Sequence, residues 1–189
     1  MPLTLDSQRI AGRGHYENAF EACLRAAGVT FVAVSDVRAS IRGRLGVKAF
    51  DYIVYPEGRP ACLVDVKGRR FAVRPGKRRR RWECWVTRAD VDGLQRWETL
   101  FGPEFTAAFV FGYWLMGQQT PAAGDPDFFT FGGRVYTFWG VSLEDYARHH
   151  RERSPKWKTI DLTTEQFIRL AWPLARWGRE PGNRQSGGC

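Results

Sequence analysis

Two predicted strands carry acidic and basic side chains where they could act together. Asp51 lies among the apolar residues of the segment 48–55, while Asp65 and Lys67 lie at the end of the apolar segment that begins at residue 61. Because successive strand side chains point to opposite faces, Asp65 and Lys67 share one face. If the two strands pair around the intervening PEGRP turn, Asp51 approaches Asp65. Two close carboxylates favour a shared proton or a bound divalent cation.

A predicted helix before these strands adds further acids. Segment 16–27 has apolar residues at helical spacing and ends at Gly28. Glu17 and Glu21, four residues apart, project from one side at the flank of its apolar stripe. One of them could complete a carboxylate cluster at the sheet edge; a solvated helix flank is the alternative. Mg²⁺, or Mn²⁺ in its place, suits oxygen ligands, and Lys67 would then orient or deprotonate a water or stabilise the transition state.

Charge predicts a polyanionic partner. The 189 residues are 43% hydrophobic and 26% charged, which is typical of a folded chain rather than a disordered one. Lys and Arg number 29 against 20 Asp and Glu, a net charge of +9, so nucleic acid is the first candidate partner. A run without acids follows Lys67; we expect it to contact phosphates, although a solvated charge run is the alternative. Its basic residues are Arg69, Arg70, Arg74, Lys77, Arg78, Arg79, Arg80 and Arg81.

Other classes of protein are disfavoured. No segment has the roughly 20 apolar residues that a membrane-spanning helix needs, and the first residues lack a secretory signal, so a cytoplasmic location is expected. The four cysteines are far apart and do not form a zinc-binding pattern. Three of them, Cys23, Cys62 and Cys84, fall in apolar segments and are expected to be small core residues.

The remaining pattern predicts a mixed fold. Capping boxes predict helix starts at Thr87, Ser142 and Thr163. The class is α/β or α+β, with a mixed central sheet flanked by helices. We expect a single domain over 1–177, with a core over about 14–115, an extension over about 116–177 and a disordered tail over 178–189. Further predicted strands are 30–34, 82–86 and 105–115, with a hairpin of 128–131 and 134–139; the predicted later helices are 87–101, 142–152 and 163–176.

The order of the acids resembles a known nuclease pattern. A helix acid at Glu17, a strand acid at Asp51 and the sequence D-V-K at 65–67 resemble the PD-(D/E)XK nuclease superfamily. The spacing from Glu17 to Gly28 resembles that of archaeal Holliday junction resolvases within it, and HYENAFE at 15–21 resembles the signature of the uncharacterised HYExAFE family of bacterial proteins. The resemblance covers about residues 14–115, and Phe50 stands where the superfamily has a proline.

The resemblance implies a restriction-endonuclease-like core and metal-dependent hydrolysis of phosphodiester bonds, with DNA as the favoured substrate. A catalytically inactive nucleic-acid-binding protein on the same fold and a protein-interaction scaffold are the alternatives, and a homodimer stays open. The candidate site comprises the metal ligands Asp51, Asp65, the Val66 backbone carbonyl and Glu17, or Glu21 in its place; the water-assisting Lys67; and the accessory residues His15 and Gln95.

Overall fold

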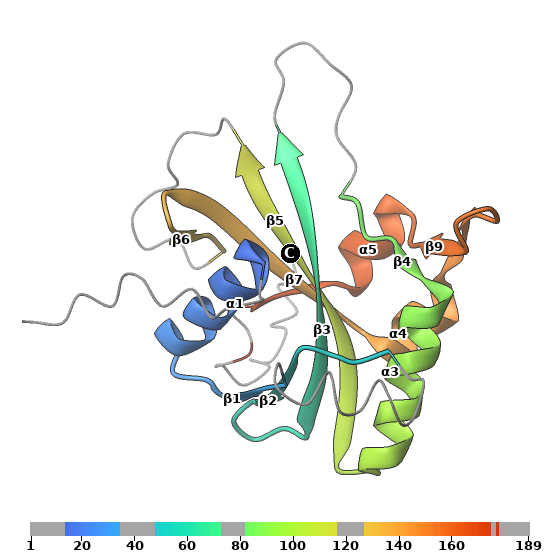
Figure 1. The fold of residues 1–189 in the computed structure, drawn as a ribbon, viewed down its shortest axis with the longest axis horizontal. Coiled ribbons are helices and arrows are strands. Elements are labelled where there is room, and N and C mark those ends of the chain that lie inside the picture. The colour runs from blue at the N-terminus through green and yellow to red at the C-terminus, as the bar shows by residue number, and fades with distance from the viewer. Residues whose placement is uncertain (1–13, 35–47, 73–81, 117–126, 175–176, 178–189) are drawn as a thin grey trace, which may run out of the picture.

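A mixed β-sheet with helices on both sides forms the centre of the protein (Figure 1), which confirms the expected fold class. The computed structural model describes residues 14–34, 48–72, 82–116, 127–174 and 177. The predicted tail over 178–189 lies outside the described residues. The elements are α1 His15–Ala26, β1 Thr30–Ala33, β2 Tyr52–Tyr55, β3 Ala61–Ala72, β4 Val86–Thr87, α3 Arg88–Phe101, β5 Phe105–Met116, β6 Phe129–Phe131, β7 Arg134–Ser142, α4 Leu143–His149, β8 Arg151–Ser154, β9 Thr159–Asp161, α5 Thr164–Leu170 and β10 Trp172–Pro173.

The long strands β3 and β5 lie in the middle of this sheet. Within the described residues the strand order is β1-β2-β3-β5-β7-β10, and β6 pairs with β7. β3 and β5 run parallel from the pair Ala61 and Phe105 to the pair Ala72 and Met116, whereas the other paired strands are antiparallel. Parallel neighbours require a crossover connection, and α3 provides it.

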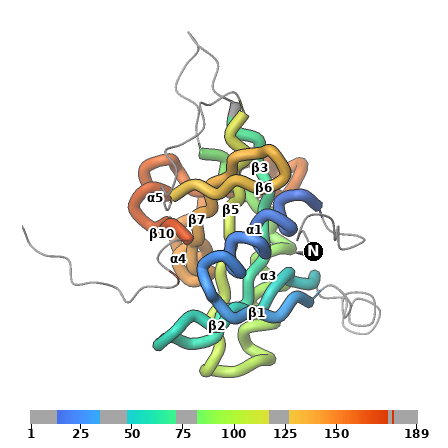
Figure 2. The backbone as a smooth tube through the Cα atoms, turned by 90° about the vertical axis from the view of Figure 1, so that its left-hand side faces the viewer, coloured from blue at the N-terminus to red at the C-terminus, as the bar shows by residue number. Residues whose placement is uncertain are grey.

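Side chains of the central strands divide between two cores. Along β5, Phe109 and Phe111 belong to the core shared with α3, α4 and α5, whereas Ala108 and Val110 belong to the core shared with α1. Figure 2 shows α1 lying in front of β3 and β5, on the side of the sheet away from α4. A strand covered on both faces is expected to be apolar throughout, which is the pattern of β5.

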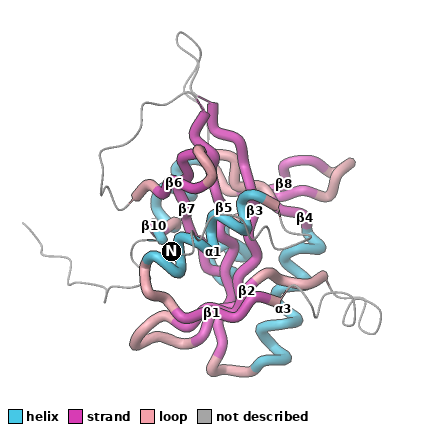
Figure 3. Tube along the Cα trace, turned by 60° about the vertical axis from the view of Figure 1, so that its left-hand side comes forward, coloured by secondary structure: helices cyan, strands magenta, loops and turns pink. Residues whose placement is uncertain are grey.

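A small second sheet lies beside the start of α3. It has the order β4-β9-β8, and all its pairs are antiparallel. Figure 3 shows β4 and β8 to the right of the main sheet. The capping box predicted at Thr87 joins β4 to α3: its hydroxyl accepts a hydrogen bond from Asp90 N, and the Asp90 side chain accepts one from Thr87 N. The helix starts predicted at Ser142 and Thr163 are also confirmed: the Ser142 hydroxyl caps α4 by accepting a hydrogen bond from Asp145 N, and Thr163 begins α5 with a full capping box.

Several predicted elements differ from the structure in their bounds. The strand predicted at 82–86 is restricted to Val86 and Thr87, because these are the residues that pair with β9; the Trp82 ring stacks on Phe71 with 4.5 Å between ring centroids. The helix predicted over 142–152 ends at His149, where β8 follows. The helix predicted over 163–176 ends at Leu170, because the next residues pair with β7 and Pro173 disfavours helix before it.

Cysteine placement agrees with the prediction of core residues. Cys62 and Cys84 are buried and Cys23 is half-buried. No described helix has both the length and the apolar character needed to cross a membrane.

Candidate active site

The candidate site lies where β2 separates from β3. β2 pairs with β3 from Tyr52 to Val54, and the backbone N–H of Asp51 donates one more hydrogen bond, to the Val64 carbonyl at 2.8 Å. Beyond this point the side chain of Asp51, rather than the β2 backbone, bonds to β3: its Oδ2 accepts a hydrogen bond from Val66 N at 2.7 Å. Asp51 is therefore fixed at the fork between the two strands.

Residues before Asp51 are drawn toward α3. The Trp97 indole donates a hydrogen bond to the Lys48 carbonyl at 2.9 Å, and Phe50 packs edge-on against Trp97 with 5.6 Å between ring centroids. Gly93 admits the Lys48 backbone, since a Cβ at this position would lie 3.1 Å from the Lys48 carbonyl oxygen. This anchoring explains why β2 begins at Tyr52 rather than at the predicted residue 48.

A network of alternating charges fills the space between β3 and α3. Lys67 Nζ lies 2.8 Å from Asp65 Oδ2 and 2.9 Å from Asp90 Oδ1. Lys48 also forms an ion pair with Asp90. The side chains of Lys67 and Asp90 are 16% and 3% exposed, so Lys67 is held by two carboxylates with little access to water. The network joins Asp65 and Lys67 of β3 to the first turn of α3.

Burial and charge act against each other in this network. Burial alone would raise the pKa of Asp90, but Lys67, Lys48 and the Thr87 hydrogen bond outweigh it and hold that pKa well below its usual range. Burial would lower the pKa of Lys67, yet Asp65 and Asp90 raise it above its usual value. Lys67 is therefore a charged ammonium group at neutral pH. Burial raises the pKa of Asp65 despite the opposing effect of Lys67.

The oxygen atoms at the fork are of the kind that a hard divalent cation binds. In an extended strand the N–H and C=O of one residue point to the same side, so the Val66 carbonyl faces the fork beside the Asp51 carboxylate. Asp51, Asp65 and this carbonyl are hard oxygen donors, which Mg²⁺ prefers. However, no group of three His, Cys, Asp or Glu side chains close enough to hold a metal ion occurs within the described residues.

The other acidic candidates lie on α1, on the opposite face of the sheet from Lys67. Glu17 is half-buried, and its carboxylate folds back over Gly14 at the beginning of its own helix. The Glu17 carbonyl accepts a hydrogen bond from the Tyr52 hydroxyl at 2.9 Å. Glu21 is buried and forms an ion pair with Arg25 at 2.6 Å. Among the described contacts, neither glutamate joins the network of Asp65 and Lys67.

The two accessory candidates occupy different surroundings. His15 Nδ1 lies 2.8 Å from the Tyr136 hydroxyl, and its ring packs edge-on against Trp114. Gln95 is exposed on α3, whereas Asp90 in the first turn of the same helix points to Lys67. Among the described residues, Asp90 is therefore the α3 side chain that contacts Lys67.

Two described residues of the basic run differ in their environment. Arg69 is half-buried: its Nη1 donates to the Gly68 carbonyl at 2.8 Å, its Nη2 donates to the Trp85 carbonyl, and its guanidinium lies 4.1 Å from the Trp85 ring centroid. Arg70 is exposed, 5.8 Å from the Trp114 ring centroid. Arg70 is thus the more accessible to a ligand. The remaining residues of the run, Arg74, Lys77, Arg78, Arg79, Arg80 and Arg81, lie outside the described residues.

Sequence reasoning missed the contribution of Asp90 and Lys48 to the charge network. Asp90 was visible only as the acid of a capping box, which indicates a local role at the helix start. Lys48 carries no motif; it joins the network because Trp97 holds its backbone near α3.

Comparison with known proteins gives a likeness in structure but none in sequence. No protein-family profile and no curated protein matches this sequence. The 1.6 Å structure of a Holliday junction resolvase from the archaeal hyperthermophile Archaeoglobus fulgidus is similar to this chain with a TM-score of 0.48 and 13% sequence identity, over 87% of this chain and 96% of that one. The likeness assigns no role to any single residue of this chain.

Proposed function

We propose that the protein is a metal-dependent nuclease that hydrolyses phosphodiester bonds in DNA. The observation that carries the proposal is the hydrogen bond from Val66 N to the Asp51 carboxylate, next in sequence to Asp65, whose carboxylate lies 2.8 Å from Lys67 Nζ. The superfamily that the sequence resembles uses this set of groups. The net charge of +9 provides the electrostatic attraction that a polyanionic substrate requires.

Each residue of the site has a separate task in this proposal. Asp51, Asp65 and the Val66 carbonyl would hold Mg²⁺, with Glu17, or Glu21 in its place, as the further ligand from α1. A divalent cation bound there supplies charge neutralisation on the phosphate and acidifies a water molecule. Lys67 remains charged because Asp65 and Asp90 raise its pKa, so it orients a water or stabilises the developing negative charge rather than acting as a base.

Cleavage assays with matched variants test the proposal. Linear duplex, single-stranded and four-way-junction DNA are incubated with the protein with and without Mg²⁺. We expect cleavage only with the metal, and its loss in Asp65→Asn and Lys67→Met with DNA binding retained. Asp92→Asn is the control, because Asp92 is exposed on α3 and does not face the site. Cleavage that persists in Asp65→Asn would refute the assigned site.

One observation favours a second function, a nucleic-acid-binding protein without turnover. Asp65 and Asp90 face Lys67 and Lys48, so two negative charges are already balanced by two positive ones without a metal ion. Calorimetric titration with Mn²⁺ separates the two functions. The nuclease requires saturable binding that Asp51→Asn weakens, whereas the binding protein would take up no ion at this site and would still bind DNA.

A further inference from the structure

The β8–β9 hairpin presents an exposed tryptophan at its tip. The hairpin extends away from the main sheet beside α5 (Figure 1), and its turn consists of Pro155, Lys156, Trp157 and Lys158. The Trp157 side chain is 70% exposed, the largest fraction of any large hydrophobic side chain in the described part of the chain. Nothing in the hydrophobic cores requires an indole at this position, since Trp157 belongs to neither of them.

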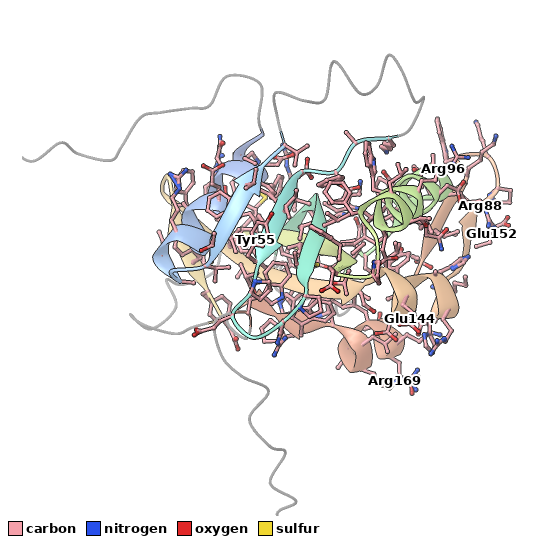
Figure 4. The ribbon with its side chains drawn as sticks, turned by 90° about the horizontal axis from the view of Figure 1, so that it is seen from below. Tyr55, Arg88, Arg96, Glu144, Glu152 and Arg169 are labelled. Carbon is pink, nitrogen blue, oxygen red and sulfur yellow. The ribbon has the colours of Figure 1, made fainter. Side chains whose placement is uncertain are left out.

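Positive charge surrounds this ring, while the charges at the base of the hairpin are paired. Arg151 forms an ion pair with Asp161 at 2.9 Å, and Glu152 forms one with Arg88 at 3.3 Å; Figure 4 shows Arg88 and Glu152 next to each other at one end of the molecule. Nearer the tip, the exposed residues Arg153, Lys156 and Lys158 have no carboxylate within ion-pair distance among the described residues. The Lys156 ammonium lies 5.4 Å from the Trp157 ring centroid.

Hydrogen bonds hold the turn in a fixed conformation. Trp157 N donates to Ser154 Oγ at 3.4 Å, and Lys158 N donates to the Pro155 carbonyl at 3.2 Å. Lys158 has a φ of 48°, a left-handed conformation that glycine adopts more easily than lysine. The turn therefore has a lysine at a position where glycine would avoid the backbone strain of a positive φ.

The hairpin is attached to the element that carries Asp90. Arg88 N donates to the Lys158 carbonyl at 2.9 Å, and Thr87 pairs with Thr159 across β4 and β9. Asp90, two residues after Arg88, contacts Lys67. A ligand at the tip would therefore lie on a hairpin that is hydrogen-bonded to the beginning of α3, the helix that carries Asp90.

A shared aromatic ring links the hairpin to β3 as well. Arg153 lies 5.4 Å from the Trp85 ring centroid, and Arg69 of β3 lies 4.1 Å from the same centroid. Cationic side chains therefore continue from the hairpin to the strand that carries Asp65 and Lys67.

We propose that the hairpin tip binds a single-stranded part of the nucleic-acid substrate. Trp157 stacks on an unpaired base, and Arg153, Lys156 and Lys158 contact the flanking phosphates. An exposed aromatic face beside cations is the combination by which proteins bind single strands without sequence preference. Bases within a duplex are stacked on each other and offer no free face, so the tip discriminates in favour of unpaired segments. This inference rests on nucleic acid being the substrate of the proposed function, but it does not require cleavage.

Binding without metal tests the inference separately from catalysis. Fluorescence anisotropy in EDTA measures the affinity for a labelled thymidine oligomer and for a duplex, each of about 20 nucleotides per strand. We expect Trp157→Ala to bind the single strand about 10-fold more weakly, and the duplex unchanged to within about 2-fold. Trp157→Phe should recover most of the loss, because a phenyl ring still stacks. The paired change of Lys156 and Lys158 to Ala should weaken both ligands, because phosphates are common to them.

Controls make the outcome decisive. Ile168→Ala removes another hydrophobic side chain, 64% exposed on α5, and should leave both affinities unchanged. The thermal unfolding midpoint of Trp157→Ala should equal that of the wild type, because the ring is outside the core. The inference is overturned if Trp157→Ala binds single strands as the wild type does, if it loses both ligands equally, or if wild-type protein binds neither. An acidic protein competing better than the oligomer for the tip would also overturn it. If the binding results are as expected but no Mg²⁺-dependent cleavage is found, the nuclease proposal is refuted and this inference is not.

Discussion

Lys67 Nζ on β3 and Asp90 Oδ1 on α3 lie 2.9 Å apart, which ties the crossover helix to the strand that precedes it. Asp90 is at the same time the acid of the capping box that begins α3. One carboxylate therefore fixes both the start of the helix and the position of the lysine. The geometry of Lys67 beside Asp65 consequently depends on a residue 23 positions further along the chain.

Asp90→Asn should destabilise the fold. The substitution removes the charge that compensates Lys67 and Lys48 and weakens the capping box, for an expected loss of about 2–4 kcal/mol in the free energy of unfolding. Chemical denaturation monitored by circular dichroism measures this loss. Asp92→Asn, in the same helix turn but exposed, should change stability by less than about 0.5 kcal/mol. Equal stability of the two variants would show that the ion pair contributes nothing.

Asp51 should have a structural role that is separable from its chemical role. Asp51→Asn keeps an oxygen that can accept the Val66 N–H, whereas Asp51→Ala leaves that buried donor without its partner. We expect Asp51→Ala to cost about 1–3 kcal/mol of unfolding free energy and Asp51→Asn about 1 kcal/mol or less. Both should abolish Mg²⁺-dependent cleavage, because neither keeps the carboxylate. A stable, fully active Asp51→Ala protein would contradict both roles.

Local sequence patterns predicted the elements that are apolar or capped. β5 was recognisable from its uninterrupted apolar run, and α3 from its capping box at Thr87. The sequence did not predict the polar hairpin of β8 and β9, because its residues show no apolar alternation, and the first two residues of β8 fall within the helix predicted over 142–152. The end of α5 was misplaced because the pairing of Trp172 with Gly140 of β7 is a tertiary contact.

The site was predictable only in part for the same reason. Strand alternation places Asp65 and Lys67 on one face, and the turn between β2 and β3 brings Asp51 to Val66. Asp90 reaches Lys67 only because the crossover helix packs over β3, an arrangement that no spacing in the sequence specifies. Candidate residues on a single hairpin could thus be grouped from the sequence, whereas their partner on the crossover helix could not.

Neighbouring arginines of the basic run should respond differently to truncation. Arg69→Ala removes hydrogen bonds to the Gly68 and Trp85 carbonyls and a stacked guanidinium, so we expect a loss of about 2 kcal/mol in unfolding free energy. Arg70→Ala should change stability by less than about 0.5 kcal/mol, because the side chain is exposed. Thermal denaturation of the two variants checks this difference.

DNA affinity should distinguish Arg69→Ala and Arg70→Ala in the opposite order from stability: the exposed Arg70 should matter for affinity, the packed Arg69 for stability. Arg70→Ala should weaken binding and reduce its salt dependence, because an accessible cation contacts phosphate. Arg69→Lys should not restore the stability of the Arg69 site, since an ammonium group cannot reproduce the planar, forked hydrogen bonding. If Arg69→Ala instead kept full stability but lost DNA affinity, Arg69 would be a phosphate ligand rather than a packing residue.

His15 should make the free energy of unfolding decrease as the pH falls from neutral to mildly acidic. Burial, and then the positive charge of Arg134, lower the pKa of His15 below its usual 6.5, against the opposing effect of Glu17. His15 Nδ1 and the Tyr136 hydroxyl form a hydrogen bond, 2.8 Å between the two atoms. Between the lowered pKa and 6.5 the unfolded chain binds more protons than the folded one, so stability rises with pH across this window and is lost as pH falls through it.

Two measurements check this pH dependence. Titration of the His15 Cε1 proton by NMR should give a pKa below 6.5, and His15→Gln should flatten the slope of the unfolding midpoint against pH in that window. Tyr136→Phe retains the ring that covers His15 but removes the hydroxyl. Because burial is the larger cause, the His15 pKa should stay depressed in this variant. A return to 6.5 in Tyr136→Phe would identify the hydrogen bond as the cause, and a wild-type pKa at or above 6.5 would contradict the prediction outright.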